Sequence, residues 1–379
     1  MKCEVAVIGG GVIGLSCAWR LAQRGIKVLL LERGELAREA SWTAGGMIAP
    51  GCELLHHPGD EDLAMSRFCF HSRDLYADFA TELFDFTGIN VELSLAGVKS
   101  TFIDWRTPGI LLLGEKNQTL EWSSKTEYFD VSTLPYLSPQ THQRPALWLP
   151  DEGQVDNRKL TLALAQAARQ SGVQIWEDAP VRNIVCENEK ISHIESAAGK
   201  VHAEKVLLCA GAWSGQIGGI PESCKPPIRP VAGQMLALRP GAKIDRVIYV
   251  KPDTYLIPRR DGRLVLGSSV EETGFQKITT TEHAERKWRD AVEVIPALQD
   301  SEIVEHWCGF RPTAPDGLPI MGKSEIENLY IATGHHRNGI LMTPATAELI
   351  TEHLIHNAPI DTAFSPLRFA ETAISVMSS

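Results

Sequence analysis

Residues 3–32 read CEVAVIGGGVIGLSCAWRLAQRGIKVLLLE, and this stretch decides the fold. Residues 3–8 form a short apolar run, which is typical of a strand buried on both faces. The glycine turn at residues 9–14 follows at once, and a helical pattern runs over residues 14–24. Residues 27–31 repeat the buried-strand pattern. The stretch therefore predicts a strand, a turn, a helix and a second strand that together form one βαβ unit.

The glycine turn has the spacing of a dinucleotide-binding fingerprint. Gly9 allows the tight turn, Gly11 lets the backbone approach a pyrophosphate, and Gly14 lets the helix pack closely on the strand. Glu32 ends the second strand, where its carboxylate can accept hydrogen bonds from ribose hydroxyls. The alternative is a glycine-rich turn that binds no ligand. The fingerprint by itself does not choose between NAD and FAD.

Two later segments favour FAD. Residues 203–210 read as a strand that ends in a second glycine turn at 211–215. Residues 329–333 read as a strand that leads into 334–340 and then into a helix over 344–356. The positive end of that helix would stabilise the negative charge of a reduced flavin. The nucleotide-binding domain is therefore expected to be assembled from both ends of the chain.

The middle of the chain is richer in strand patterns. A hairpin is predicted from residues 254–259 and 263–268, and another strand from residues 303–310. Such an insert would form a lid over the flavin. The predicted fold class is α/β, a Rossmann-like FAD-binding domain with a β-rich (α+β) substrate domain inserted. The predicted FAD-binding domain comprises residues 1–88, 146–225 and 312–379, and the predicted cap domain comprises residues 89–145 and 226–311.

Composition narrows the function classes. The chain has 379 residues and a formal net charge of −10, which disfavours a general nucleic-acid binder. The eight cysteines contain no CxxC pair and lack the dense spacing of a disulfide scaffold. The uncharged run between Glu4 and Arg20 is too short to span a bilayer. We expect a cytoplasmic protein with no membrane partner.

Four segments carry a family resemblance. They are EASWTAGGMIAP at 39–50, YLIPR at 255–259, GFRP at 309–312 with DGLP at 316–319, and GHHRNGI at 334–340. These segments are similar to those of glycine oxidases in the D-amino-acid oxidase superfamily. With the glycine turn, the similarity covers most of the chain. Residues 89–113 are longer than this region usually is in glycine oxidases.

The resemblance implies a set of FAD contacts and a substrate site. The cofactor would be held by Val12, Ile13, Glu32, Arg33, Ala40, Ser41, Gly45, Gly46, Met47, the backbone of Val181, Gly334, His335, His336, Arg337, Asn338, Gly339, Ile340 and Leu341. Some sarcosine oxidase relatives attach FAD through a cysteine after the arginine strand, but no cysteine follows Arg311 here, so we expect non-covalent FAD. The substrate would meet Arg311 and Arg337, with Tyr255 lining the pocket.

These substrate roles are chemically reasonable. Arginine offers a permanently charged, two-pronged donor that matches the carboxylate of an amino acid. The plainer interpretations are an ion-paired surface arginine for Arg311, a packing residue for Tyr255, and a flavin or fold contact for Arg337. Tyr255 and Ile257 share one face of the hairpin, but periodicity does not say which face meets the flavin.

The resulting hypothesis is FAD-dependent oxidation of glycine, sarcosine or D-alanine to the imine or 2-oxo acid, with O2 reduced to hydrogen peroxide. The imine could pass to a thiazole synthase for thiamine, and a homo-oligomer is expected. The alternatives are a D-amino-acid or N-methyl-amino-acid dehydrogenase that reduces a quinone, and a flavin-binding protein without activity. His56, His57, Asp60 and Glu61 are interpreted as a solvated loop, so no metal is predicted.

Overall fold

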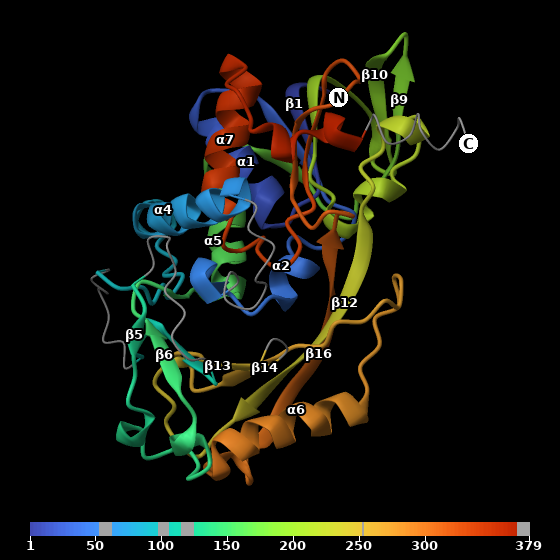
Figure 1. The fold of residues 1–379 in the computed structure, drawn as a ribbon. Helices are drawn as coiled ribbons and strands as arrows, with labels where there is room; N and C mark the ends of the chain where they lie inside the picture. The colour runs from blue at the N-terminus through green and yellow to red at the C-terminus, as the bar shows by residue number, and fades with distance from the viewer. Residues whose placement is uncertain (53–62, 98–105, 115–124, 252–253, 370–379) are drawn as a thin grey trace.

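The predicted βαβ unit forms the centre of an eight-stranded sheet. The computed structural model describes residues 1–52, 63–97, 106–114, 125–251 and 254–369 (Figure 1). Strand β1 (Lys2–Ile8) lies parallel between β2 (Val28–Leu31) and β11 (Gly199–Leu208). The main path of the sheet is completed by β8 (Gln174–Trp176) beyond β2, and by β18 (Leu329–Thr333) and β17 (Ile320–Lys323) beyond β11.

Alternate residues of these strands enter two different cores. Val5 and Val7 pack against helices α1 (Val12–Gln23), α4 (Leu63–Thr87), α5 (Asn157–Gln170) and α7 (Thr343–His356). Ala6 and Ile8 face the opposite core, which is covered by β9 (Val181–Glu187) and β10 (Lys190–Ser196). The central strands are apolar throughout because both of their faces are buried.

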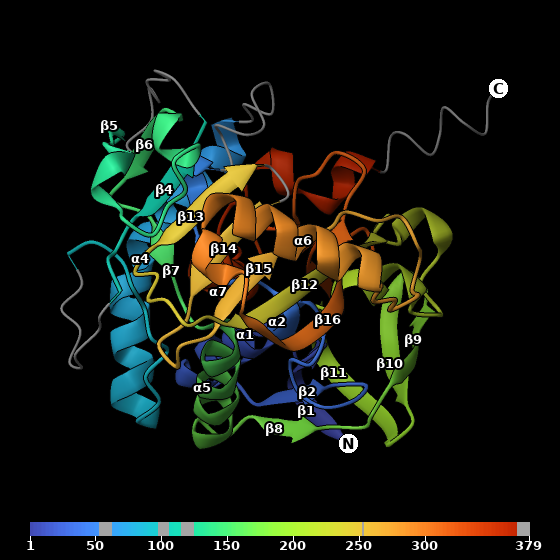
Figure 2. The ribbon, with the colours of Figure 1, turned by 90° about the horizontal axis from the view of Figure 1, so that it is seen from below.

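A second eight-stranded sheet forms the cap. Its order is β16 (Glu302–Thr313), β12 (Arg229–Arg239), β15 (Leu264–Gly267), β14 (Thr254–Pro258), β13 (Val247–Lys251), β4 (Ile110–Leu113), β6 (Ala146–Leu149) and β5 (Glu127–Tyr128). Helix α6 (Thr281–Val294) crosses the outer face of this sheet (Figure 2). The inner face packs on residues such as Met47 and Cys52, which precede α4 in the chain.

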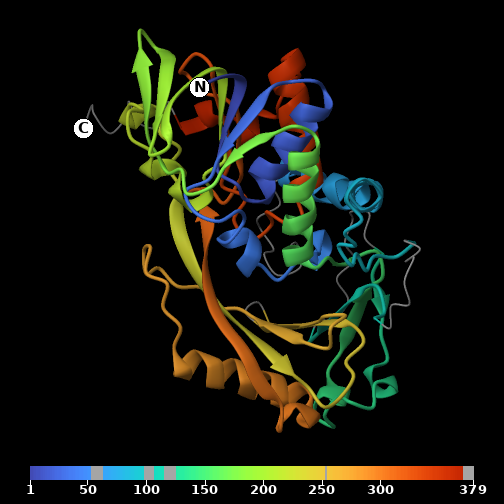
Figure 3. The same cartoon turned by 180° about the vertical axis from the view of Figure 1, so that it is seen from behind.

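The two parts are joined by long strands and short elements. Strands β12 and β16 run from the first domain down into the cap (Figure 3). Helix α2 (Ala40–Thr43) lies between the parts (Figure 1), and β3 (Met47–Ile48) pairs with β7 (Gly153–Gln154) in a small two-stranded sheet. The 3-10 helices are η1 (Val131–Thr133), η2 (Thr141–Gln143), η3 (Gly211–Gln216), η4 (Glu222–Cys224), η5 (Pro296–Leu298), η6 (Thr362–Phe364) and η7 (Pro366–Phe369).

The predicted α/β class is confirmed, but two details differ. Residues 146–149 were assigned to the FAD-binding domain, yet they form β6 and pair with β4 in the cap sheet, because both are short apolar strands in register. Arg311 was expected after its strand, but β16 continues through Arg311 to Thr313 by pairing with β12. The hairpin of β14 and β15 agrees closely with the prediction. Among the described residues, no helix has the length and apolar character needed to cross a membrane.

Candidate cofactor and substrate site

The glycine turn brings backbone atoms into contacts that a side chain would prevent. A Cβ atom at Gly14 would lie 1.9 Å from the carbonyl oxygen of Gly9. Gly9 itself has a φ of +109°, and its Cβ would lie 2.4 Å from the carbonyl oxygen of Cys209 in the neighbouring segment. Helix α1 begins directly after Gly11, and the Val12 N–H donates to Ser41 Oγ at 3.0 Å. The glycines therefore let this turn pack directly against neighbouring backbone at the start of α1.

A cavity of about 230 Å³ lies beside this turn, and we call it the Glu32 cavity. It contains many of the residues predicted to hold the nucleotide end of FAD. Its lining includes Gly9, Gly11, Glu32, Arg33, Glu39, Ala40, Ser41, Val181, Gly211 and Trp213. Val12, Ile13 and Gly14 form the first turn of α1 next to it.

Glu32 is buried and held in place by backbone donors. Its Oε2 accepts from the Gly10 N–H at 2.7 Å, and its Oε1 accepts from the Gly34 N–H at 3.1 Å. Each carboxylate oxygen retains a second lone pair, so the group can also accept from ribose hydroxyls. Arg33 is exposed, with its guanidinium 3.4 Å from the ring centroid of Trp213 and a hydrogen bond to Glu39.

A second cavity of about 90 Å³ lies between the two domains, and we call it the Arg311 cavity. Ala40 lines both this cavity and the Glu32 cavity. Most of the predicted flavin-ring and substrate residues lie here. The lining consists of Ala40, Thr43, Ala44, Gly45, Gly46, Met47, Ala49, Gly233, Met235, Tyr255, Ser268, Gly309, Phe310, Arg311, His336, Arg337, Asn338 and Ile340.

Arg311 extends its guanidinium across Gly233 on the neighbouring strand. Nη1 donates to the carbonyl oxygen of Ala232 at 3.1 Å, and Nη2 donates to Ser268 Oγ at 2.7 Å. A Cβ at Gly233 would lie 2.5 Å from both Nη atoms, so only glycine leaves room for this arrangement. The guanidinium is fixed at the cavity wall, with the fork geometry suited to a carboxylate.

Tyr255 lies on the inner face of the cap sheet, which resolves the question that periodicity left open. Its ring rests on Gly267, where a Cβ would lie 2.3 Å from ring carbons. Tyr249 is its cross-strand partner, with ring centroids 5.7 Å apart. The Tyr249 hydroxyl accepts a hydrogen bond from Arg337 Nη2 at 2.9 Å. Arg337 therefore links the chain's C-terminal segment to the cap at the substrate end of the cavity.

The loop predicted to contact the flavin is fixed by side chains from distant segments. Arg259 is buried, and its Nη2 donates to the carbonyl oxygen of Gly45 at 2.8 Å and to Asn157 Oδ1 at 2.9 Å. Burial lowers the pKa of Arg259 from its ordinary value. Gly46 has a φ of +72°, and a Cβ there would lie 2.2 Å from the carbonyl oxygen of Val155. The backbone at Gly45 and Gly46 is therefore held in one conformation by Arg259 and by its close packing against Val155.

The segment before α7 is anchored from α4. Tyr76 donates its hydroxyl hydrogen to the carbonyl oxygen of Ile340, and Ser72 donates to that of Leu341 at 2.7 Å. His335 is buried below the cavity, where its Nε2 lies 3.1 Å from Thr346 Oγ1. Burial lowers the pKa of His335 to about 3, so its imidazole is neutral near pH 7. His336 Nδ1 lies 2.8 Å from Thr313 Oγ1.

Of the remaining predicted residues in this segment, Gly334 directly follows β18 with a φ of +78°, and Gly339 lies in a turn. Sequence reasoning assigned no role to Gly233, Gly267, Tyr249, Asn157 or Ser268. Glycines inside strands do signal a close approach, so the first two had a usable signal. The other three depend on pairing between distant segments.

The two cavities lie on either side of Ala40 and together contain most of the residues predicted to contact FAD and substrate. Gly9, Gly11 and Glu32 line the Glu32 cavity, and Arg311 and Tyr255 line the Arg311 cavity. Within the described part of the chain, no three His, Cys, Asp or Glu side chains are grouped to hold a metal ion. The His56, His57, Asp60 and Glu61 segment lies outside the described residues.

Known proteins resemble the chain over most of its length. A family model described as FAD dependent oxidoreductase matches residues 4–353. The chain is 35% identical over 381 residues to the bifunctional protein ThiO/ThiG of Synechocystis sp., covering 97% of this chain and 54% of that relative. It is 32% identical over 363 residues to glycine oxidase of Pseudomonas aeruginosa, covering 95% of this chain and 97% of that protein.

A solved structure of similar fold is glycine oxidase from Geobacillus kaustophilus, with a TM-score of 0.84 and 26% identity. That match covers 97% of this chain and 99% of the solved one. The chain therefore spans about half the length of the bifunctional relatives it matches and nearly all of the glycine oxidases.

Proposed function

This chain belongs to the family of FAD dependent oxidoreductases, and from that premise we propose that it oxidises glycine and other small amines. FAD, the cofactor predicted from the sequence, is the cofactor of this family. The proposed products are the imine or 2-oxo acid and hydrogen peroxide, with sarcosine and D-alanine as further substrates. Similarity to glycine oxidases of Pseudomonas aeruginosa and Geobacillus kaustophilus supports this choice.

The observation that carries the proposal is the meeting of Arg311, Arg337 and Tyr255 in one small cavity. Arg311 and Tyr255 come from the cap, and Arg337 comes from the segment before α7. We assign carboxylate binding to Arg311 because its guanidinium is already oriented by Ala232 and Ser268.

The residues of this chain bind and orient the substrate rather than attack it. The carboxylate lies on the Arg311 fork, which fixes the direction of the α-carbon by two charge-assisted hydrogen bonds. Tyr255 closes one wall with its ring held against Gly267. When bound, FAD supplies the acceptor for the hydride that leaves the α-carbon, and O2 regenerates it with release of hydrogen peroxide.

We place FAD across the two cavities without a covalent bond, with the predicted residues from Gly9 to Leu341 as its contacts. The imine is proposed to pass to a thiazole synthase, and the bifunctional relative supports such a link. A homo-oligomeric, cytoplasmic enzyme completes the proposal. A quinone-reducing dehydrogenase remains the contrasting outcome of the assay.

The test is a peroxide assay on the FAD-loaded protein with glycine, sarcosine and D-alanine in air. Arg311→Leu should raise the KM for glycine by about 30-fold or more, because truncating one partner of a charged hydrogen-bonded pair costs about 2–5 kcal/mol. FAD should stay bound. Arg239 is exposed and is the last residue of the cap strand β12, so Arg239→Leu should leave the KM unchanged.

Two results would overturn the proposal. One is an Arg311→Leu protein with the KM of the parent. The other is a parent protein whose FAD is reduced by these amines without peroxide formation in air, which would instead indicate the dehydrogenase.

A further inference from the structure

Helix α2 contributes residues to the lining of both cavities, yet it is only four residues long. Ala40 lines both cavities, and Thr43 lines the Arg311 cavity. A single helical turn is not stable alone in water, since it fixes many dihedral angles for few hydrogen bonds. Its position must therefore come from contacts made by other segments.

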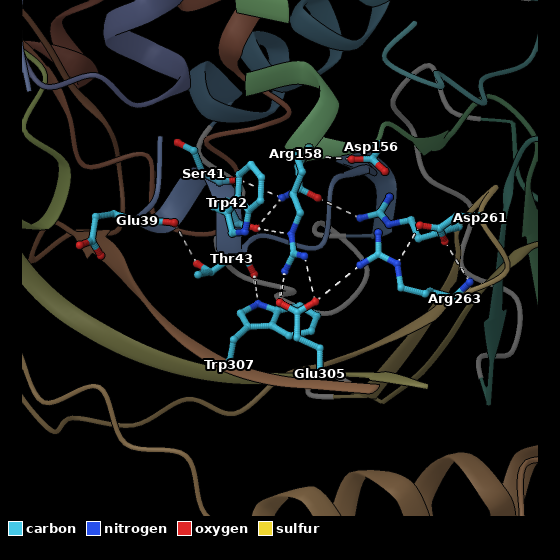
Figure 4. A network of polar contacts seen from close by, with 12 residues as sticks. Glu39, Ser41, Trp42, Thr43, Asp156, Arg158, Asp261, Arg263, Glu305 and Trp307 are labelled. Atoms are coloured by element: carbon cyan, nitrogen blue, oxygen red, sulfur yellow. Dashed lines mark hydrogen bonds and ion pairs between the residues drawn. The ribbon is translucent and has the colours of Figure 1, made fainter. Parts of the chain in front are cut away.

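An ion pair between α5 and the cap strand β16 lies against Trp42 of α2 (Figure 4). Arg158, in the first turn of α5, donates from Nη1 and Nη2 to the two carboxylate oxygens of Glu305 at 2.9 and 2.6 Å. Glu305 belongs to β16 of the cap. The Arg158 side chain is 18% exposed, so this fork-to-fork pair is screened less than one on the open surface.

The same guanidinium also holds Trp42 of α2. It lies 5.0 Å from the ring centroid of Trp42 and 5.0 Å from that of Trp307, which comes from β16. Arg158 Nε donates to the carbonyl oxygen of Trp42 at 3.4 Å, and Trp307 Nε1 donates to that of Thr43 at 3.0 Å (Figure 4). One cation thus packs between an aromatic ring of α2 and an aromatic ring of the cap.

The last carbonyl groups of α2 have no hydrogen-bond donors within so short a helix. Side chains from the start of α5 and from β16 donate to them instead. Asn157 Nδ2 donates to the carbonyl oxygens of Ser41 and Trp42, both at 2.9 Å. Asp156 begins α5 by accepting from the N–H groups of Arg158 and Lys159. The start of α5 therefore sets the orientation of α2, and the Arg158–Glu305 pair ties that arrangement to the cap.

We propose that Arg158 and Glu305 are positioning residues for FAD, which clamp α2 between the domains and so fix the wall shared by both cavities. Neither residue lines a cavity, so the effect is transmitted through Trp42 and Thr43. The clamp can act only when the cap is closed on α2, because Glu305 and Trp307 both come from β16. The proposal uses the FAD site alone and is independent of which amine is oxidised.

The experiment is FAD titration of the apoprotein, followed by flavin fluorescence without amine substrate, well below the thermal unfolding midpoint of each variant. Arg158→Met and Glu305→Gln should each raise the dissociation constant of FAD about tenfold, the size of a typical coupling between contacting groups. The FAD dissociation constant of the double variant should be no higher than that of the single variant that binds FAD less tightly, because both changes break the same clamp.

The matched control is the Arg144–Glu293 ion pair, with an N–O distance of 2.7 Å within the cap. Neither of these residues lines either cavity, so Arg144→Met and Glu293→Gln should leave the FAD dissociation constant unchanged. Arg158→Lys keeps the charge but loses the fork, so its dissociation constant should be intermediate.

Parent-like FAD affinity in Arg158→Met would overturn the proposal. So would a double variant in which the losses of FAD binding free energy of the two single variants add. If Arg158→Met does not fold, Glu305→Gln decides the question, because it keeps the shape of the side chain and removes only its charge. An amine assay that fails while these affinities shift as expected would count against the proposed function and leave the clamp intact.

Discussion

Gly233→Ala should separate the positioning of Arg311 from the stability of the fold. The added Cβ would lie 2.5 Å from both Nη atoms and 2.7 Å from Cζ of Arg311. Ordinary contact begins near 3.4 Å, so the guanidinium must move by about 1 Å. The atoms that must move are at the end of a flexible side chain, so the fold should tolerate the change. A displacement of this size at a substrate-orienting group lowers the rate by about 100-fold.

The assay is kcat/KM for glycine from peroxide formation, with FAD content and thermal unfolding measured on the same samples. Gly241→Ala is the control, because a Cβ at that position would meet no atom within 4 Å. We expect about 100-fold lower kcat/KM in Gly233→Ala, with FAD content and the unfolding midpoint near those of the parent. Equal kcat/KM in the two variants would refute the role assigned to the Arg311 fork.

Two further predictions concern other parts of the molecule. Gly14→Ala should abolish FAD binding and lower the unfolding midpoint, because its Cβ would lie 1.9 Å from a backbone oxygen that cannot move alone. Gly34→Ala is the control, because a Cβ at that position would meet no atom within 4 Å. FAD retention by Gly14→Ala would contradict the close-packing argument. Burial raises the pKa of Glu152 from 4.5 to about 7. The folded state therefore binds this proton more tightly than the unfolded state, and the resulting stabilisation is fully present below about pH 4.5. It is lost as the pH rises from about 4.5 to about 7. Glu152→Gln should therefore reduce the fall in thermal stability between pH 5 and about pH 8 in a pH series; an unchanged slope would show that Glu152 does not titrate in this range.

The sequence by itself determined the elements whose signals are local. The glycine turn, the strands on either side of α1, and the β14–β15 hairpin follow from periodicity and from glycine placement over a few residues. The strand and helix near the C-terminus were predicted within one residue of their bounds, because apolar patterns and a helix-starting proline mark them. The resemblance then pointed to Tyr255 and Arg311 on the strength of short motifs.

Only the tertiary structure decided which faces and which distant partners meet. Tyr255 faces the first domain because the opposite face of its sheet is covered by α6. Residues 146–149 joined the cap because their register with β4 buries both apolar strands, a choice that depends on a partner more than 30 residues away. The Arg158–Glu305 pair joins residues 147 positions apart and has no local signal at all. Local patterns specify elements, whereas contacts between side chains far apart in sequence exist only once those elements have packed.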